Sequence, residues 1–149
     1  MWQVKKFDEL TTKELYAILQ LRTAVFVVAQ KRIYQEIDGR DLRALHIFKT
    51  GQNGKIVAYA RVFLLDDGQT VSFGRVVTSK AVRGQGVGGQ LLNQVMTTIK
   101  KYYPDRPIAI ESQQQVQGFY RRVGFVSQGK PFIYKSTPHV KMVHAPLWD

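Results

Sequence analysis

A glycine-rich loop constrains this chain more than any other stretch of its sequence. Residues 83–89 read Arg-Gly-Gln-Gly-Val-Gly-Gly and lie between a strand-like run over 71–78 and a helix-like run over 91–103. The four glycines let the backbone turn without Cβ clashes, so that successive N–H groups can converge on one anion near the positive end of the helix dipole. We therefore expect a phosphate-binding loop, formed by Arg83, Gly84, Gln85, Gly86, Val87, Gly88 and Gly89.

The sequence of this loop excludes one common phosphate-binding motif and gives little support to a second one. The ATP-binding P-loop ends in Gly-Lys-Ser/Thr, whereas this loop ends in Gly-Gly-Gln. The dinucleotide fingerprint Gly-x-Gly-x-x-Gly fits Gly84, Gly86 and Gly89, but the acidic residue at the required distance, Asp105, lies in a turn after Pro104. A loop that only capped a helix would need one glycine rather than four.

Two motifs give the chain a resemblance to a known family. Arg83, Gly86 and Gly88 spell Arg-x-x-Gly-x-Gly, which resembles the acetyl-coenzyme A loop of the GNAT acetyltransferases. Residues 118–125 resemble the Tyr-x-x-x-Gly-Phe element of the same family. The runs 21–30, 34–39 and 138–142 are similar to its ElaA-like branch, so that the likeness covers nearly the whole chain.

The hydrophobic patterning predicts a mixed α/β fold in one domain over residues 1–149. Strands are expected over 2–7, 45–48, 55–65, 70–78, 107–111, 133–134 and 140–143, and helices over 12–28, 87–103 and 114–123. The order strand, glycine loop, helix, strand predicts one parallel pair in an otherwise antiparallel sheet. The resemblance implies a GNAT-like fold, with a central splayed parallel pair and about four flanking helices.

Composition narrows the classes of function. The 22 Lys and Arg against 11 Asp and Glu give a net charge of +11, which raises nucleic acid as a partner, but the excess is dispersed and has no RNP or zinc-finger spelling. Cysteine is absent, which excludes disulfides, thiolate metal sites and a cysteine nucleophile and suits the cytoplasm. No apolar run has the length of a membrane span. We expect a cytoplasmic protein without a metal, and a homodimer stays an open option.

The resemblance also implies a cofactor site. The pantothenate arm of acetyl-coenzyme A would lie between the two strands of the parallel pair, bonded to the main chain of Val76, Val77 and Thr78. Gln113 stands where many relatives carry an asparagine and is a candidate contact. Tyr120 occupies the position of the family's proposed general acid and would also touch the cofactor.

Acetyl transfer to an amine needs a neutral nitrogen, a donor to the developing oxyanion and a proton for the departing thiolate. The N–H of Val77 is the expected oxyanion donor, and the phenol of Tyr120 has a basicity comparable to that of the thiolate that it would protonate. For the general base we favour His139, while His46, Glu111 and a chain of waters remain open.

The acceptor side is predicted to lie under the polar loop 30–42. Glu36, Asp38 and Asp41 in this loop are candidates to attract a cationic amine, and a solvated turn is the alternative. Arg22 interrupts the apolar stripe of the preceding helix, either as a side chain that reaches solvent or as a group turned toward a cleft.

Two departures from the family pattern also fall on the acceptor side. Ala29 and Lys135 stand where ElaA-like chains carry a glutamate and an aspartate. The leading hypothesis is an acetyl-coenzyme A-dependent N-acetyltransferase acting on a primary amine. The alternatives are a non-catalytic module that binds acyl-coenzyme A and, with less support, a nucleic-acid-binding protein.

Overall fold

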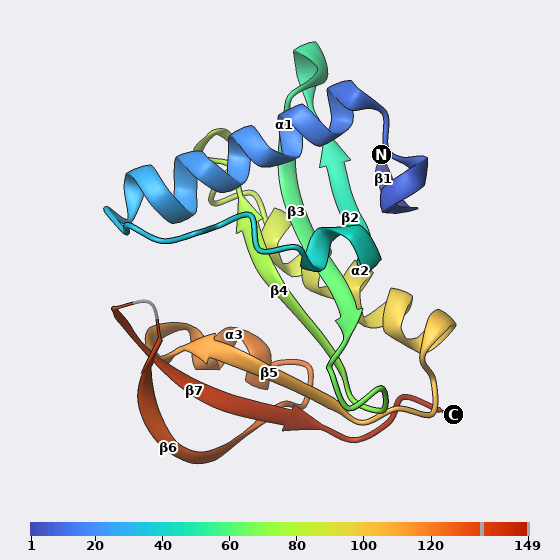
Figure 1. The fold of residues 1–149 in the computed structure, drawn as a ribbon, viewed down its shortest axis with the longest axis vertical. Coiled ribbons are helices and arrows are strands. Elements are labelled where there is room, and N and C mark those ends of the chain that lie inside the picture. Colours follow the sequence, from blue (N-terminus) through green and yellow to red (C-terminus); the bar gives the residue numbers. More distant parts are fainter. Residues whose placement is uncertain (135, 149) are drawn as a thin grey trace.

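The computed structural model describes residues 1–134 and 136–148. Within these residues seven strands form one sheet in the order β1-β2-β3-β4-β5-β7-β6, with three α-helices packed against it (Figure 1). The strands are β1 (Trp2–Lys6), β2 (Leu45–Thr50), β3 (Ile56–Leu64), β4 (Val71–Thr78), β5 (Ile108–Gln113), β6 (Val126–Tyr134) and β7 (Thr137–His144). The α-helices are α1 (Thr12–Arg22), α2 (Val87–Tyr102) and α3 (Gln117–Arg121). The shorter helical segments are η1 (Phe7–Glu9), η2 (Thr23–Ala29), η3 (Arg40–Arg43), η4 (Gln52–Gly54), η5 (Lys80–Val82) and η6 (Gln114–Val116).

The sheet divides between β4 and β5. Every other neighbouring pair is antiparallel, whereas β4 and β5 are parallel and share a single paired position, Val71 with Ile108. The N–H of Val71 donates to the carbonyl of Pro107 at 3.0 Å, and beyond this point the two strands diverge (Figure 1). The mixed fold and the parallel pair expected from the sequence are therefore confirmed.

Helices cover both faces of the sheet, because successive side chains on a strand point to opposite faces. On β2, Ile47 packs in the cluster formed with α2, whereas its neighbour Phe48 packs in the cluster formed with α1. On β3, Ala58 and Tyr59 divide in the same way. Tyr120 of α3 joins the α2 cluster, so α2 and α3 lie on one face and α1 on the other.

The first helix begins as the sequence predicts and changes its winding later. The Thr11 side chain accepts the N–H of Glu14 at 3.0 Å, and Glu14 accepts the N–H of Thr11 at 2.9 Å, which completes the expected capping box. After Arg22 the chain continues as the π-wound segment η2, in place of the α-helix expected over 12–28. This wider turn carries Val25 and Phe26, which line a cavity beside β4 and β5.

The carboxyl-terminal strands differ most from expectation. Strand β6 begins at Val126 instead of near Ile133, and every one of its residues is exposed. An edge strand that buries neither face has no alternating apolar pattern, so the periodicity gave no sign of its first residues. The predicted helix over 114–123 is divided into η6 and α3. No helix in the described part of the chain is both long and apolar enough to cross a membrane.

Candidate active site

The glycine loop presents a group of main-chain donors at the start of α2. Gly84 and Gly86 have φ values of +81° and +76°, in the left-handed region that glycine adopts without strain. The first helical hydrogen bond runs from the N–H of Gln90 to the carbonyl of Gly86. Within the described residues, five N–H groups of the loop have no protein acceptor: those of Gly84, Gly86, Val87, Gly88 and Gly89. Unpaired donors at a helix N-terminus form a ready anion site.

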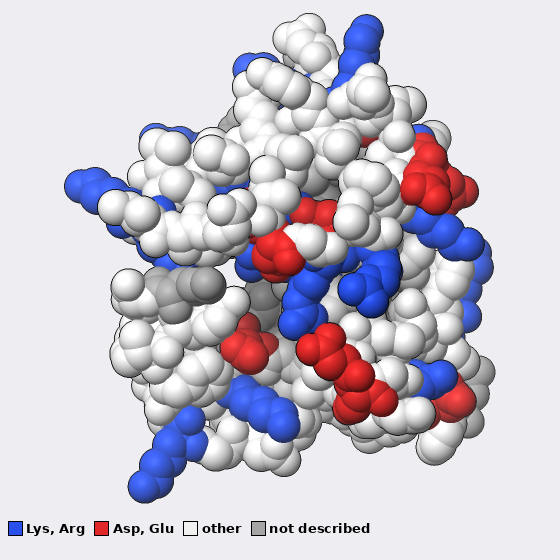
Figure 2. Space-filling view, viewed as in Figure 1, with Lys and Arg blue, Asp and Glu red and all other residues white. Residues whose placement is uncertain are grey.

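A cavity of about 400 Å³ lies against both strands of the divided pair. Figure 2 shows a hollow on this face of the molecule, with basic and acidic side chains at its margins. The cavity reaches the glycine loop at Arg83, while Gly84 to Gly89 lie outside its lining. It brings together seven of the residues predicted from the sequence: Val76, Val77, Thr78, Arg83, Gln113, Tyr120 and His139.

Strand β4 carries a bulge beside this cavity. Four residues of β4, Gly74 to Val77, lie opposite three of β3, Tyr59 to Arg61, and Arg75 within the bulge has a φ of +52°. The N–H of Ser79 donates to the carbonyl of Val57 on β3. Main-chain groups alternate in direction along a strand, so Val77, two residues earlier, also turns its main-chain groups toward β3, where it is paired with Tyr59. The register therefore favours the N–H groups of the alternate residues Val76 and Thr78, which face the gap, over that of Val77 as donors to a ligand.

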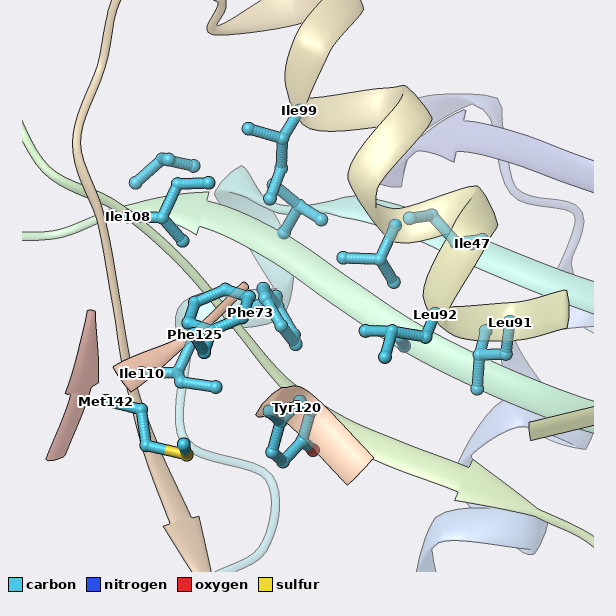
Figure 3. Close-up of a cluster of buried hydrophobic side chains, with 14 of the residues drawn as sticks. Ile47, Phe73, Leu91, Leu92, Ile99, Ile108, Ile110, Tyr120, Phe125 and Met142 are labelled. Atoms are coloured by element: carbon cyan, nitrogen blue, oxygen red, sulfur yellow. The ribbon is translucent and has the colours of Figure 1, made fainter. Parts of the chain in front are cut away.

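Tyr120 stands where the aromatic part of the core meets the cavity. Its ring centroid lies 5.8 Å from that of Phe73 and 6.2 Å from that of Phe125, and its hydroxyl turns away from both rings (Figure 3). The hydroxyl has no hydrogen-bond partner in the described part of the chain. Burial raises the pKa of Tyr120 above its ordinary value, so the phenol stays protonated at neutral pH.

His139 lines the same cavity with a fixed ring. Its Nδ1 lies 2.8 Å from the carbonyl oxygen of Thr137. Because a carbonyl oxygen can only accept, Nδ1 carries the hydrogen, and the neutral ring keeps Nε2 as its acceptor nitrogen. Phe132 stacks on the ring at a centroid distance of 6.2 Å, and Tyr134 meets it edge-on at 5.3 Å.

The other candidate bases differ in position. His46 is fully buried outside the cavity, where its Nε2 donates to the Asp41 carbonyl at 2.9 Å and its Nδ1 accepts from the Tyr59 hydroxyl at 2.6 Å. Burial lowers the pKa of His46, and both of its ring nitrogens are engaged with other groups of the protein. Glu111 is exposed and lines the cavity. Gln113 accepts from Gln115 at 2.8 Å, and so holds its amide at the margin of the cavity.

Three arginines and three carboxylates form a closed ring of ion pairs over the sheet, which we call the ionic ring. Its nitrogen–oxygen distances lie between 2.5 and 3.5 Å, and charges of opposite sign alternate around it. The order is Arg22, Glu36, Arg75, Asp38, Arg61, Asp41 and back to Arg22. The ring fastens the loop 30–42 to α1, β3 and β4.

The ionic ring corrects the expectation that the acidic loop attracts a cationic substrate. Glu36 and Asp41 are buried, and each is paired with two arginines. Of the three carboxylates in the ring, only that of Asp38 lines the cavity. Burial alone would raise the pKa of Asp38, but the hydrogen bonds and charge of Arg61 outweigh it and hold this pKa well below its usual range. Arg22 neither reaches solvent nor faces the cleft, because its side chain is buried inside the ring.

Sequence reasoning missed Arg61 and Arg75, which complete the ring. Both interrupt apolar strand runs, a place where an arginine is rare unless it is paired. Together with Arg22, they give three arginines that interrupt apolar runs, and one loop carries three carboxylates. These equal numbers were the signal in the sequence that could have predicted the ion pairs. Of the two departures on the acceptor side, Ala29 ends η2, and Lys135 lies outside the described residues. In the described part of the chain, no group of three or more His, Asp and Glu side chains is placed to hold a metal ion.

The divided sheet and the donor-rich loop define a class of protein, and comparison with known families agrees. Residues 9–145 match the acetyltransferase (GNAT) domain. This match covers most of the chain, and the protein therefore belongs to the GNAT acetyltransferase family.

Within this family the chain is similar to ElaA. It is 41% identical to protein ElaA of Escherichia coli over 143 residues, which cover 95% of this chain and 94% of that protein. The crystal structure of Escherichia coli ElaA superposes with a TM-score of 0.89 at 40% identity over 96% of this chain and 97% of that one. An acyl-CoA N-acyltransferase from Pseudomonas aeruginosa superposes with a TM-score of 0.90 at 41% identity, over 97% and 99% of the two chains.

Proposed function

We propose that this protein is an acetyl-coenzyme A-dependent N-acetyltransferase that acts on a primary amine by direct transfer in a ternary complex. The observation that carries the proposal is the set of unpaired N–H groups on the glycine loop beside a gap between parallel strands. The loop fits a diphosphate, because its donors are free and Arg83 adds a charge at the same end of the cavity. The open edges of β4 and β5 fit the amides of a pantothenate arm.

When bound, acetyl-coenzyme A supplies an acyl carbon activated by a thioester. The loop residues Arg83 to Gly89 would hold the phosphates, and the main chain of β4 over Val76 to Thr78 would position the arm. An N–H of β4 in the gap, that of Val76 or Thr78, would stabilise the negative charge that develops on the acyl oxygen. Gln113 lies at the end of β5, on the other side of the gap from β4, where its amide can orient either substrate.

Two side chains that line the cavity are placed to move the protons of the transfer. Nε2 of His139 is the acceptor nitrogen, so it can take the proton that the attacking amine loses as its C–N bond forms. The hydroxyl of Tyr120 has no protein partner and stays protonated, so it can give its proton to sulfur as the C–S bond breaks. No covalent intermediate with the protein is required.

Release of the free thiol of coenzyme A tests the proposal. A panel of primary amines is incubated with acetyl-coenzyme A and the protein, and the thiol is followed with a disulfide reagent, which meets no protein thiols because the chain contains no cysteine. We expect release that depends on both protein and amine, with an N-acetylated product in the mass spectrum. Tight binding of acetyl-coenzyme A without release for any amine would favour a non-catalytic binding module instead.

A further inference from the structure

The charges along the cavity favour an acceptor that is not purely cationic. Five arginines line the cavity, against the two carboxylates of Asp38 and Glu111. Arg61 and Arg75 are balanced within the ionic ring, which contains equal numbers of the two charges. Outside the ring, Arg40 and Arg83 line the cavity together with one further carboxylate, that of Glu111, so this part of the lining is net positive.

Arg40 is the arginine of this group that is best placed to bind a ligand at the end opposite the glycine loop. Its guanidinium lies over the ring of Phe63, 4.6 Å from the centroid, and makes no ion pair or hydrogen bond within residues 1–134 and 136–148. Only its backbone N–H is engaged, by the carboxylate of Asp38 at 3.1 Å. The face of the ring attracts the guanidinium and leaves its N–H donors free for a bidentate anion.

The register of β3 and β4 gives the distance from Arg40 to the reaction centre. Phe63, under the guanidinium, is paired with Ser72 of β4. Val76, at the bulge where the acyl group would lie, is four residues further along the same strand. A strand rises about 3.3 Å per residue, so the two places are on the order of 10 Å apart once the bulge is allowed for.

We propose that the acceptor is an amine that also carries a carboxylate, separated from its nitrogen by about 10 Å, and that Arg40 binds this carboxylate. The inference rests on the proposed function and names the substrate class of the same site. Charge favours this class over diamines, because a second ammonium group would lie against the unpaired guanidinium.

Matched acceptors test this inference. Aminooctanoate with its terminal amine, the corresponding aminooctanamide and diaminooctane have similar lengths and differ in the distal group, and glycine is too short to reach Arg40. We expect kcat/KM for aminooctanoate to exceed that for the amide by about tenfold to a hundredfold, the usual effect of hydrogen bonds to a charged group. Diaminooctane should be the poorest of the three. Glycine should show no advantage over glycinamide. Equal rates for all three long acceptors would overturn the proposal.

Variants assign the effect to Arg40. Arg40→Gln should bring the ratio of aminooctanoate to aminooctanamide to about one, and Arg40→Lys should restore part of it, since lysine keeps the charge but not the fork. Arg43→Gln, which removes the same charge from the same segment η3 outside this cavity, should leave the ratio unchanged. If Arg40→Gln instead weakens acetyl-coenzyme A binding as strongly as Arg83→Gln does, Arg40 serves the cofactor and the proposal is wrong.

A binding measurement separates this inference from the proposed function. Calorimetry of aminooctanoate and aminooctanamide with the protein saturated with coenzyme A needs no turnover. A tighter Kd for the carboxylate that is lost in Arg40→Gln supports the inference even if no amine is acetylated. Turnover of amines without any such preference keeps the transferase and overturns the inference.

Discussion

Tyr120 combines two properties that are seldom found in one side chain. Its ring is packed among aromatic residues of the core, whereas its hydroxyl faces the cavity without a protein partner. The hydroxyl therefore contributes little to folding and is free for chemistry. The same is true of Nε2 in His139, whose other nitrogen is fixed by the carbonyl of Thr137.

Replacing Tyr120 with phenylalanine should separate these properties. Tyr120→Phe keeps the ring, so the free energy of unfolding and the Kd for acetyl-coenzyme A should stay near their wild-type values. Loss of the general acid should lower kcat by about a hundredfold, measured by thiol release. Because burial raises the pKa of Tyr120, the wild-type rate should not fall on the alkaline side until the pH exceeds about 10. An unchanged kcat would remove Tyr120 from the proton-transfer step.

At the scale of elements, the glycine loop owes its shape to a small number of positions. Gly86 has left-handed φ at the N-cap of α2, whereas Gly89 lies within the first turn of the helix, where an added Cβ would have no heavy atom within 4 Å. An alanine is therefore strained at the first position and is accommodated at the second.

The two alanine variants should change stability in opposite directions. Gly86→Ala should lower the free energy of unfolding by about 1–2 kcal/mol, the cost of left-handed backbone in an L-residue, and weaken acetyl-coenzyme A because the donors move. Gly89→Ala should raise stability by about 0.5–1 kcal/mol, since glycine is a poor helix former, and keep the N–H in place. Urea unfolding and calorimetry measure both effects. Equal stability changes would contradict the loop geometry.

The ionic ring is the second element that positions the site. It joins the loop 30–42 to three regular elements and so holds the roof of the cavity in place. The charges of Arg22 and Arg61 outweigh the opposing effect of burial and lower the pKa of Asp41. A carboxylate with a lowered folded pKa stabilises the protein above its unfolded pKa of about 3.9, and this contribution is lost as the pH falls toward the folded value.

Acid titration of stability should reveal the ring. At neutral pH, Asp41→Asn should cost about 3 kcal/mol, because it leaves two buried arginines short of a partner. The gap between wild type and variant should shrink below about pH 4, where the wild-type carboxylates also take up protons. Asp66→Asn, in the exposed turn after β3, is the control and should change stability little. A gap that does not depend on pH would mean that the ring carries no net charge interaction.

At the scale of the whole molecule, the two parts of the sheet meet at one paired position and enclose the cavity. The net charge of +11 raised nucleic acid as a partner, but the ionic ring is balanced, and Arg40 and Arg83, which make no ion pair within the described residues, line the cavity. Together with membership of the GNAT family, this placement favours anionic small molecules over a nucleic-acid surface.

Binding across the divided sheet should stabilise the whole fold. Acetyl-coenzyme A at 100 times its Kd should add about 2.7 kcal/mol to the free energy of unfolding, because only the folded state assembles the loop and both strands. Arg83→Gln should reduce this gain at the same ligand concentration. Denaturant titration with and without ligand measures it, and no gain at millimolar ligand would rule out the cofactor site.

The sequence by itself determined the elements whose signals are local. The glycine loop, the capping box at Thr11, the parallel pair and the candidate residues Tyr120 and His139 were all identified from spacing or from resemblance, and the structure places both side chains in one cavity. Local geometry decides such features, since a left-handed turn needs glycine and a helix start needs a cap.

Only the tertiary structure decided how the charges pair and which N–H groups face the gap. From the sequence alone, the carboxylates of loop 30–42 could have been exposed to solvent or paired with arginines. They are paired, because Arg61 on β3 and Arg75 on β4 fold against the loop. The bulge in β4 shifted the register, and with it the direction of the N–H groups of Val76 and Val77. Both outcomes come from contacts between segments distant in sequence, and periodicity within one segment carries no information about them.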